Sequence, residues 1–285
     1  MKKGSLIATA FLAALALAAS PAAGEEKTAS FAPDFKDGEA WQAALKTRID
    51  LILSSGKENE EPAPLTVGRE EEWVFRIFSA DKGIPAKAEK EVRRSAEIRE
   101  CPLLGGKTTR PDFPEGKTFS LDFAEGAPRA AVSAPESDRG AAIPARVLAG
   151  LEDELRLPYL AAFPSGPVTT GTAWSREGKD LLGLLRRLGL GPAREGKCDF
   201  RLAELSLERG AAVATIELVL SGVKLREEDG GMEAILDGKG TLRFDLDKGR
   251  IAGASLKGGA RASDPATGLS GKGTFELSFE MKKAG

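Results

Sequence analysis

The chain has 285 residues, a formal net charge of −2 and no histidine. Because the net charge is close to zero, the chain lacks the broad positive potential that draws proteins to nucleic acid, and we expect no nucleic-acid partner. The absence of histidine excludes Ser-His-Asp and Cys-His catalytic sites and most zinc and copper sites. We therefore expect a protein without a metal or another cofactor.

Residues 1–24 have the pattern of a cleaved signal peptide. Lys2 and Lys3 precede an apolar run from Leu6 to Ala19, and small residues follow at 20–24. This run is shorter than the roughly 20 apolar residues of a transmembrane helix, and no later segment fits better, so we expect no integral membrane segment in the mature chain. An uncleaved N-terminal anchor is the alternative. The mature protein is predicted to be periplasmic or secreted, with a disordered linker at residues 25–36.

Four short motifs occur twice in the same order, which indicates an internal duplication. They are a GxAW tetrapeptide, a turn followed by a long strand-like segment, a Leu-x-Gly-Lys tetrapeptide, and an alternating segment that ends at a glycine-containing turn. The pairs are 38–41 and 171–174, 81–100 and 208–227, 104–107 and 236–239, and 118–126 and 241–249. The chain accordingly divides into a first β repeat at 37–142, a connecting helix at 143–158 and a second β repeat at 159–285.

Each repeat is predicted to form an antiparallel meander. Gly83, Gly126, Gly210 and Gly249 each stand third in a short loop, where a type I turn followed by a residue at positive φ joins two strands. Residues 41–53 fit both the strand and the helix period, and we favour a strand. The other strands are expected at 72–80, 86–100, 117–123 and 130–132, and at 199–207, 212–226, 240–246, 251–256 and 271–281, with loops at 55–67 and 134–142.

Two segments, 145–157 and 180–188, have the apolar stripe of an amphipathic helix. Pro144 stands just before the first of them, where the opening turn of a helix tolerates proline. The expected fold class is therefore mainly β (α+β). A curved sheet would be built from two duplicated antiparallel meander halves, with one or two helices covering it.

The two copies of the second motif differ in the face that they present. Every odd-numbered residue of 87–99 is polar, so this face of the first copy is expected to be wet. At the aligned positions the second copy has Ile216, Leu218 and Leu220. If such a side chain stayed exposed to water, the fold would lose about 1.5 to 3 kcal/mol of stabilisation for each of them. This face must therefore be covered. A helix of the chain itself is the favoured cover, which makes this a core face, and an apolar, lipid-like ligand such as an acyl chain is the alternative.

Two further pairs of residues correspond in the repeats. Asp122 and Asp245 could supply the two carboxylates of a glycosidase, although their positions next to exposed turns explain them better. Trp41 and Trp174 open the two halves, where core packing is favoured over carbohydrate stacking.

Cys101 and Cys198 are the only two cysteines. An oxidising compartment permits a disulfide between them, and closing so long a loop would stabilise the fold by about 4 to 5 kcal/mol in the chain-entropy model. Because the sequence does not fix the distance between the two residues, a disulfide and two free thiols are equal alternatives.

Two segments resemble a diffuse group of uncharacterised exported bacterial proteins of unknown function. Residues 163–174, FPSGPVTTGTAW, are similar to the passage "LP-x-x-PV-x-x-G-x-x-W" of that group, with Phe163 in place of leucine. Residues 239–251 are similar to its "G-x-x-x-x-D-x-x-x-G-R-I" hairpin. The resemblance covers most of the mature chain and implies a repeated antiparallel sheet. It implies no activity, so no functional residue is carried over.

The function that these observations favour is that of an exported, non-enzymatic envelope protein. It would bind a lipid-like ligand or a partner chain on its sheet. The apolar face of Ile216, Leu218 and Leu220 is the observation that suggests this binding. A carboxylate-dependent hydrolase and a purely structural envelope protein are the alternatives.

Overall fold

The computed structural model describes residues 27–284, except 56–60, 103–105, 111–114, 125–126, 134–149, 154–155, 192 and 227–230. The predicted signal peptide and the predicted loop at 134–142 lie outside the described residues.

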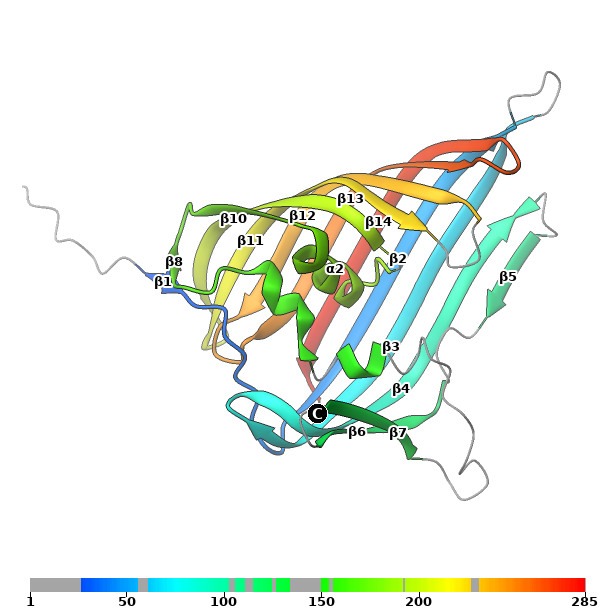
Figure 1. Cartoon of the computed structure of the whole chain (residues 1–285). Helices are drawn as coiled ribbons and strands as arrows, with labels where there is room; N and C mark the ends of the chain where they lie inside the picture. Colours follow the sequence, from blue (N-terminus) through cyan, green and yellow to red (C-terminus); the bar gives the residue numbers. More distant parts are fainter. Residues whose placement is uncertain are drawn as a thin grey trace, which may run out of the picture.

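One curved antiparallel sheet dominates the fold, as the sequence predicts (Figure 1). It ends in two edge strands, β7 and β9, and β5 (Gly106–Arg110) adds to β4 beside β6. Residues 41–53 form a strand, as favoured. Across the sheet the strands are β7 (Ala127–Ser133), β6 (Thr118–Ala124), β4 (Ile84–Cys101), β3 (Ala63–Asp81), β2 (Ala40–Ser54), β14 (Leu269–Lys283), β13 (Arg250–Asp264), β12 (Glu233–Asp245), β11 (Ala211–Arg226), β10 (Ala193–Glu208) and β9 (Ala173–Glu177).

The hairpins β3–β4 and β10–β11 have the same turn. In each, two residues connect the last ladder pair, and both residues have positive φ: 50° and 78° at Lys82 and Gly83, 51° and 84° at Arg209 and Gly210. Positive φ at both central positions is the requirement of a type I′ turn, whose twist matches that of the strands. The predicted type I turn with a bulge is therefore wrong at these two positions, although the predicted hairpins form.

In both halves of the chain, the strands follow one another across the sheet in chain order. β10, β11, β12 and β13 follow one another as neighbours, and β3, β4, β6 and β7 do the same. The tryptophan of each GxAW motif lies in the strand beside the first member, Trp41 in β2 and Trp174 in β9. A duplication would produce this correspondence, and we keep it as a proposal.

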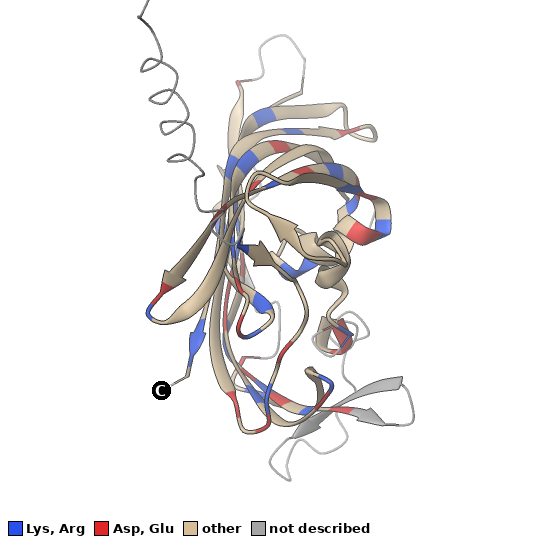
Figure 2. Ribbon diagram, turned by 90° about the vertical axis from the view of Figure 1, so that its left-hand side faces the viewer, with Lys and Arg blue, Asp and Glu red and all other residues tan. Residues whose placement is uncertain are grey.

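Two short helical elements cover one side of the sheet, which we name the inner face (Figures 1 and 2). α2 (Gly178–Arg187) forms where the sequence predicts a helix, and it buries Leu181, Leu184 and Leu185. The 3-10 helix η3 (Pro158–Ala162) packs beside it. The helix predicted at 145–157 lies largely outside the described residues; residues 150–153 and 156 are helical.

Ile216, Leu218 and Leu220 lie in the hydrophobic core of the inner face. Their exposed fractions are 0%, 2% and 3%. On β10, Phe200 pairs with Leu218 and Leu202 with Ile216, and α2 packs against this strand. The chain's own residues thus account for the burial of these three side chains, and a ligand needs separate support.

The expectation of one continuous wet face at 87–99 is wrong because β4 contains a bulge. The register of the β3–β4 ladder shifts by one residue at Arg93. An extra residue reverses the alternation of side chains beyond it. Lys90 before the bulge and Ser95 after it are therefore both buried, with 6% and 1% of their surface exposed.

The segment predicted as a disordered linker, 25–36, is part of the fold from its first described residue, 27. It contains β1 (Thr28–Ala29), which pairs with β8 (Val168–Thr169). Phe31 is buried, and its ring stacks on Phe163 with 5.0 Å between the centroids. The apolar residues in this short stretch anchor it in the core. The charged and small residues around them give the segment the composition of a linker, which is why the sequence does not predict this role.

Candidate binding site on the inner face of the sheet

Three cations and two tryptophans meet on the inner face, beneath η3 and the end of α2. We call this group the tryptophan–cation cluster; its members are Trp41 of β2, Trp73 of β3, Lys90 of β4, Arg187 of α2 and Arg250 of β13. Lysine and arginine side chains are mostly exposed in folded proteins. The cluster is therefore unusual for a region that otherwise forms a hydrophobic core.

Strand pairing places the tryptophans and the lysine on the same face. Trp41 and Lys90 both pair with Phe75, one from each side. Trp73 stands two residues before Phe75 and so shares its face. Trp41, Trp73 and Lys90 are only 5%, 3% and 6% exposed.

The cations lie over aromatic rings. Lys90 Nζ is 4.5 Å from the centroid of the Trp73 ring, and Arg187 Cζ is 5.8 Å from the same centroid. Arg187 also contacts the rings of Phe279 and Tyr159, at 5.4 and 5.9 Å. Such contacts stabilise a cation by about 1 to 2 kcal/mol, which offsets part of the cost of burial.

Arg250 is the most deeply buried of the three cations, with 3% of its surface exposed. Its guanidinium carbon lies 3.0 Å from the centroid of the Trp41 ring. The nearest carboxylate is that of Asp245, whose Oδ2 is 3.8 Å from Arg250 Nη2, beyond hydrogen-bond distance. Burial lowers the pKa of Arg250 to about 10, against the opposing attraction of Asp245 and Glu39. The guanidinium is therefore still charged at neutral pH.

Arg250, Trp41 and Trp73 together have four N–H groups that are buried without an acceptor among the described residues. They are Nε and Nη1 of Arg250 and the indole Nε1 of Trp41 and Trp73. Leaving a buried donor unsatisfied costs about 1 to 3 kcal/mol, more when the group is charged. An acceptor supplied from outside the chain would recover that free energy.

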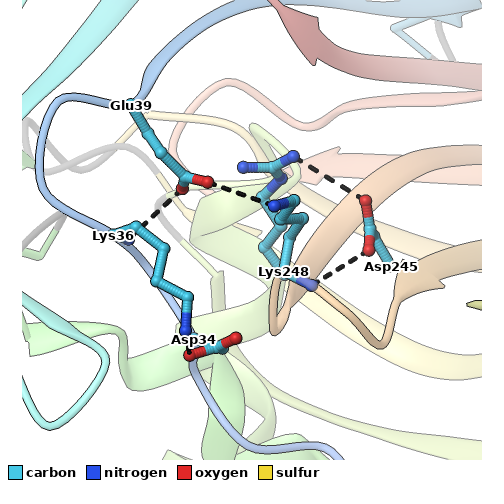
Figure 3. A network of polar contacts seen from close by, with 6 residues as sticks. Asp34, Lys36, Glu39, Asp245 and Lys248 are labelled. Carbon is cyan, nitrogen blue, oxygen red and sulfur yellow. Dashed lines mark hydrogen bonds and ion pairs between the residues drawn. The ribbon is translucent and has the colours of Figure 1, made fainter. Parts of the chain in front are cut away.

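A second polar group lies at the rim of the cluster, and its charges are mostly engaged with one another (Figure 3). Glu39 faces Lys248, with 3.3 Å between Oε1 and Nζ. The backbone N–H of Lys248 donates to Asp245 Oδ1 at 3.0 Å. Burial raises the pKa of Asp245, while the pull of Arg250 opposes this shift. The rim therefore compensates the charge of Arg250 only in part.

The structure does not bring Asp122 and Asp245 together. Asp122 lies on β6, 3.8 Å from Lys87, and Asp245 ends β12. β4, β3, β2, β14 and β13 separate these two strands, which is about 29 Å measured along the sheet at the usual spacing between strands. The two carboxylates thus lie on strands that are not neighbours and have different cationic neighbours, Lys87 and Arg250, so no observation makes them a catalytic pair. Within the described part of the chain there is also no group of three metal-ligating side chains.

The two equivalent tryptophans differ in their hydrogen bonding. Trp174 stacks on Phe200 with 5.4 Å between the ring centroids, and its indole N–H donates to the carbonyl of Ala162 at 2.9 Å. Trp174 is thus a packed and satisfied residue, whereas Trp41 belongs to the cluster and has no acceptor for its indole N–H among the residues described.

Cys101 and Cys198 are both buried as free thiols, so the disulfide that the sequence left open is not formed in this structure. Cys101 ends β4 and Cys198 lies on β10, with six strands between them, β3, β2, β14, β13, β12 and β11. Burial raises the pKa of the Cys198 thiol, which makes it an inert core residue at neutral pH.

Lys90, Arg187 and Arg250 belong to no motif that predicts a binding site from the sequence. One signal was present for Lys90, which stands between Ala88 and Val92 on the same face of a strand. Arg187 looked like an ordinary cation in the last turn of a helix, and Arg250 like the end of a hairpin loop.

No protein-family model matches the chain, and a comparison with curated proteins also gives no match. Three solved structures resemble it loosely. One is lipovitellin, described in a study of its lipid–protein interactions (10% identity, 88% of this chain, TM-score 0.42); the present chain spans 26% of that chain. Another is DynF from the dynemicin biosynthesis pathway of Micromonospora chersina (10% identity, 90% of this chain and 86% of that chain, TM-score 0.23). The third is a DUF1329 family protein from Desulfovibrio piger (7% identity, 87% and 86%, TM-score 0.14). At these TM-scores the likenesses carry no argument about ligand or activity.

No helix in the described part of the chain has the length and hydropathy needed to cross a membrane.

Proposed function

We propose that this chain is an exported, non-enzymatic envelope protein that binds a lipid-like molecule on the inner face of its sheet. The molecule would lie between the strands and the cover formed by α2 and η3. The observation that carries the proposal is the group of four buried donors without an acceptor, set in a wall that also contains buried apolar side chains of the core. A ligand that joins a polar end to an apolar body matches both parts of this wall.

The surroundings of the cluster suit an apolar body. Phe279 and Ala43 lie beside it on β14 and β2, with Leu45 one step further along the same face of β2. These side chains are 4% exposed or less. Each methylene that a ligand buries against such a surface contributes about 0.8 kcal/mol.

α2 and η3 form one cover over the sheet. α2 has ten residues, too few for a helix that is stable on its own, and no side chain caps its N-terminus. It packs so closely on η3 that a Cβ at Gly183 would lie 2.6 Å from the backbone of Pro158. α2 turns its leucine face inward, and Trp174 and Arg176 of β9 donate hydrogen bonds to η3, so an acyl chain would lie against the leucine face beneath the cover.

Isolation of the mature protein from a host that exports it tests this proposal. Native mass spectrometry of the gently purified protein is expected to show a species heavier than the chain by one ligand, and organic extraction should release a molecule with an aliphatic chain. Return of the extracted molecule to the stripped protein should restore the complex and leave the molecule chemically unchanged. A protein that is isolated empty and then binds no amphiphile at all would contradict the proposal, and chemical conversion of the ligand would contradict its non-enzymatic part.

A further inference from the structure

Resting on that proposed function, we infer that the polar end of the ligand is an oxyanion, a carboxylate or a phosphate. Its oxygens would accept hydrogen bonds from Arg250 and from the indole N–H groups of Trp41 and Trp73. The inference deepens the proposal because it selects one class of amphiphile and names the groups that recognise it.

The first argument is the kind of hydrogen-bonding group that lacks a partner. All four are donors, namely Nε and Nη1 of Arg250 and Nε1 of Trp41 and of Trp73. An oxyanion offers acceptors only, and several of them at one place. A hydroxyl or amide head would bring donors of its own into a site that already has too many.

The second argument is charge. Arg250 is a deeply buried cation, and the two carboxylates that act on it, Asp245 and Glu39, lie at the rim. Glu39 is already paired with Lys248. A bound anion would therefore compensate the charge of Arg250, whereas a cationic head group would add a further positive charge beside it.

The third argument is geometry. Trp41 and Trp73 come from neighbouring strands, and Trp73 stands diagonally across the β2–β3 ladder from Trp41, two residues from its partner Phe75. Diagonal neighbours on one face have Cα atoms about 7 to 8 Å apart, which leaves the two indole groups able to reach a single head group. Arg250 stacks directly on the Trp41 ring and so lies at the same point of the face.

The test compares ligands that share one tail and differ in the head. The purified protein is titrated with decanoate, decyl phosphate, 1-decanol and decyltrimethylammonium below their micelle concentrations, and with acetate and inorganic phosphate as heads without a tail. Tryptophan fluorescence reports binding, because two of the three tryptophans of the chain belong to the cluster. We expect decanoate or decyl phosphate to bind at least tenfold more tightly than 1-decanol, which corresponds to about 1.4 kcal/mol. The preference between these two anions identifies the head group.

Variants place the effect in the cluster. Arg250→Met is expected to lose at least tenfold in affinity for the anionic ligand and to keep the affinity for 1-decanol. Arg243→Met removes an exposed arginine of β12 that pairs with Glu208, and it should change neither affinity. Trp174→Phe, which alters a tryptophan with a satisfied N–H, should also leave the preference for anions intact.

Failure of the inference and failure of the proposed function give different results. Equal affinity for decanoate and 1-decanol, or an Arg250→Met protein that still prefers the anion, would overturn the inference and leave lipid binding in place. Inorganic phosphate binding as tightly as decyl phosphate, with loss in Arg250→Met, would support the oxyanion site and contradict the lipid-like ligand. If no probe binds to a protein that is folded by circular dichroism, both are overturned.

Discussion

Replacement of Arg250 by methionine should stabilise the ligand-free protein. Burial lowers the pKa of this guanidinium from its ordinary value of 12.5 to about 10, so the charged form is held in the folded state at a cost. A shift of this size corresponds to about 3 kcal/mol. Methionine has a similar length, brings no charge, and can lie on the ring of Trp41 where the guanidinium lies now.

Two losses reduce the expected gain. The contact between the cation and the Trp41 ring is worth about 1 to 2 kcal/mol, and Asp245 loses a neighbouring positive charge. The side chain of Asp245 keeps 15% of its surface exposed and accepts a hydrogen bond from the backbone of Lys248, so it is not left buried and unpaired. The net expectation is a gain of about 1 to 2 kcal/mol, which raises the Tm of a domain of this size by about 2 to 4 °C.

Urea unfolding and differential scanning calorimetry of the stripped protein measure this change, with Arg243→Met as the matched surface control. A cation whose folded-state pKa is depressed destabilises the fold at every pH below that pKa, so the gain should be the same at pH 6 and pH 9. If Arg250→Met lowers the free energy of unfolding by 1 kcal/mol or more, the reasoning is refuted. That result would show that Arg250 already has its hydrogen-bonding and charge partners in the ligand-free fold and needs no bound anion.

Three further predictions concern the fold. Gly249 has φ of 59°, and a Cβ there would collide with the backbone of the N-terminal segment. Gly249→Ala should therefore lower the free energy of unfolding by at least about 2 kcal/mol. Gly210→Ala, where φ is 84° and the space is open, should lower it by only about 1 kcal/mol, and urea titration of both variants decides this. Phe31→Ala should cost about 3 to 5 kcal/mol in the same assay, and a cost below 1 kcal/mol would restore the linker interpretation. Asp237 accepts a hydrogen bond from the backbone N–H of Gly222, which lowers the pKa of its carboxyl group. The stabilisation of the fold by this hydrogen bond is present above the ordinary pKa of about 3.9 and is lost as the pH falls through the depressed pKa. Asp237→Ala should therefore be about 1 kcal/mol less stable than the parent protein at pH 6 and equal to it near pH 2, and a difference that does not change with pH would contradict this.

The sequence predicted the sheet well because strand periodicity and turn residues are local signals. Alternation of apolar and polar residues marks β11, and the glycines at 83 and 210 mark the turns on which the hairpins fold. The bulge at Arg93 could not be seen, because a single extra residue leaves the composition of the strand unchanged while it moves every later side chain to the other face.

The candidate site could not be predicted in the same way. Its members come from five different elements, and each has an ordinary appearance in its own segment. Arg250 follows a glycine turn and Arg187 ends a helix, places where exposed cations are common. Strand pairing, the curvature of the sheet and the placement of the cover together bring them to one point, and all three depend on contacts between residues that are distant in the chain.

The most direct test of the central claim is the indole N–H region of the NMR spectrum. The chain has three tryptophans, so three indole signals are expected, and substitution of each by phenylalanine assigns them. On titration with the anionic ligand that binds best, the Trp41 and Trp73 signals should shift and become protected from hydrogen exchange, saturating at one ligand per chain, while the Trp174 signal should stay in place. Saturable binding that leaves the Trp41 and Trp73 signals unmoved would contradict the account.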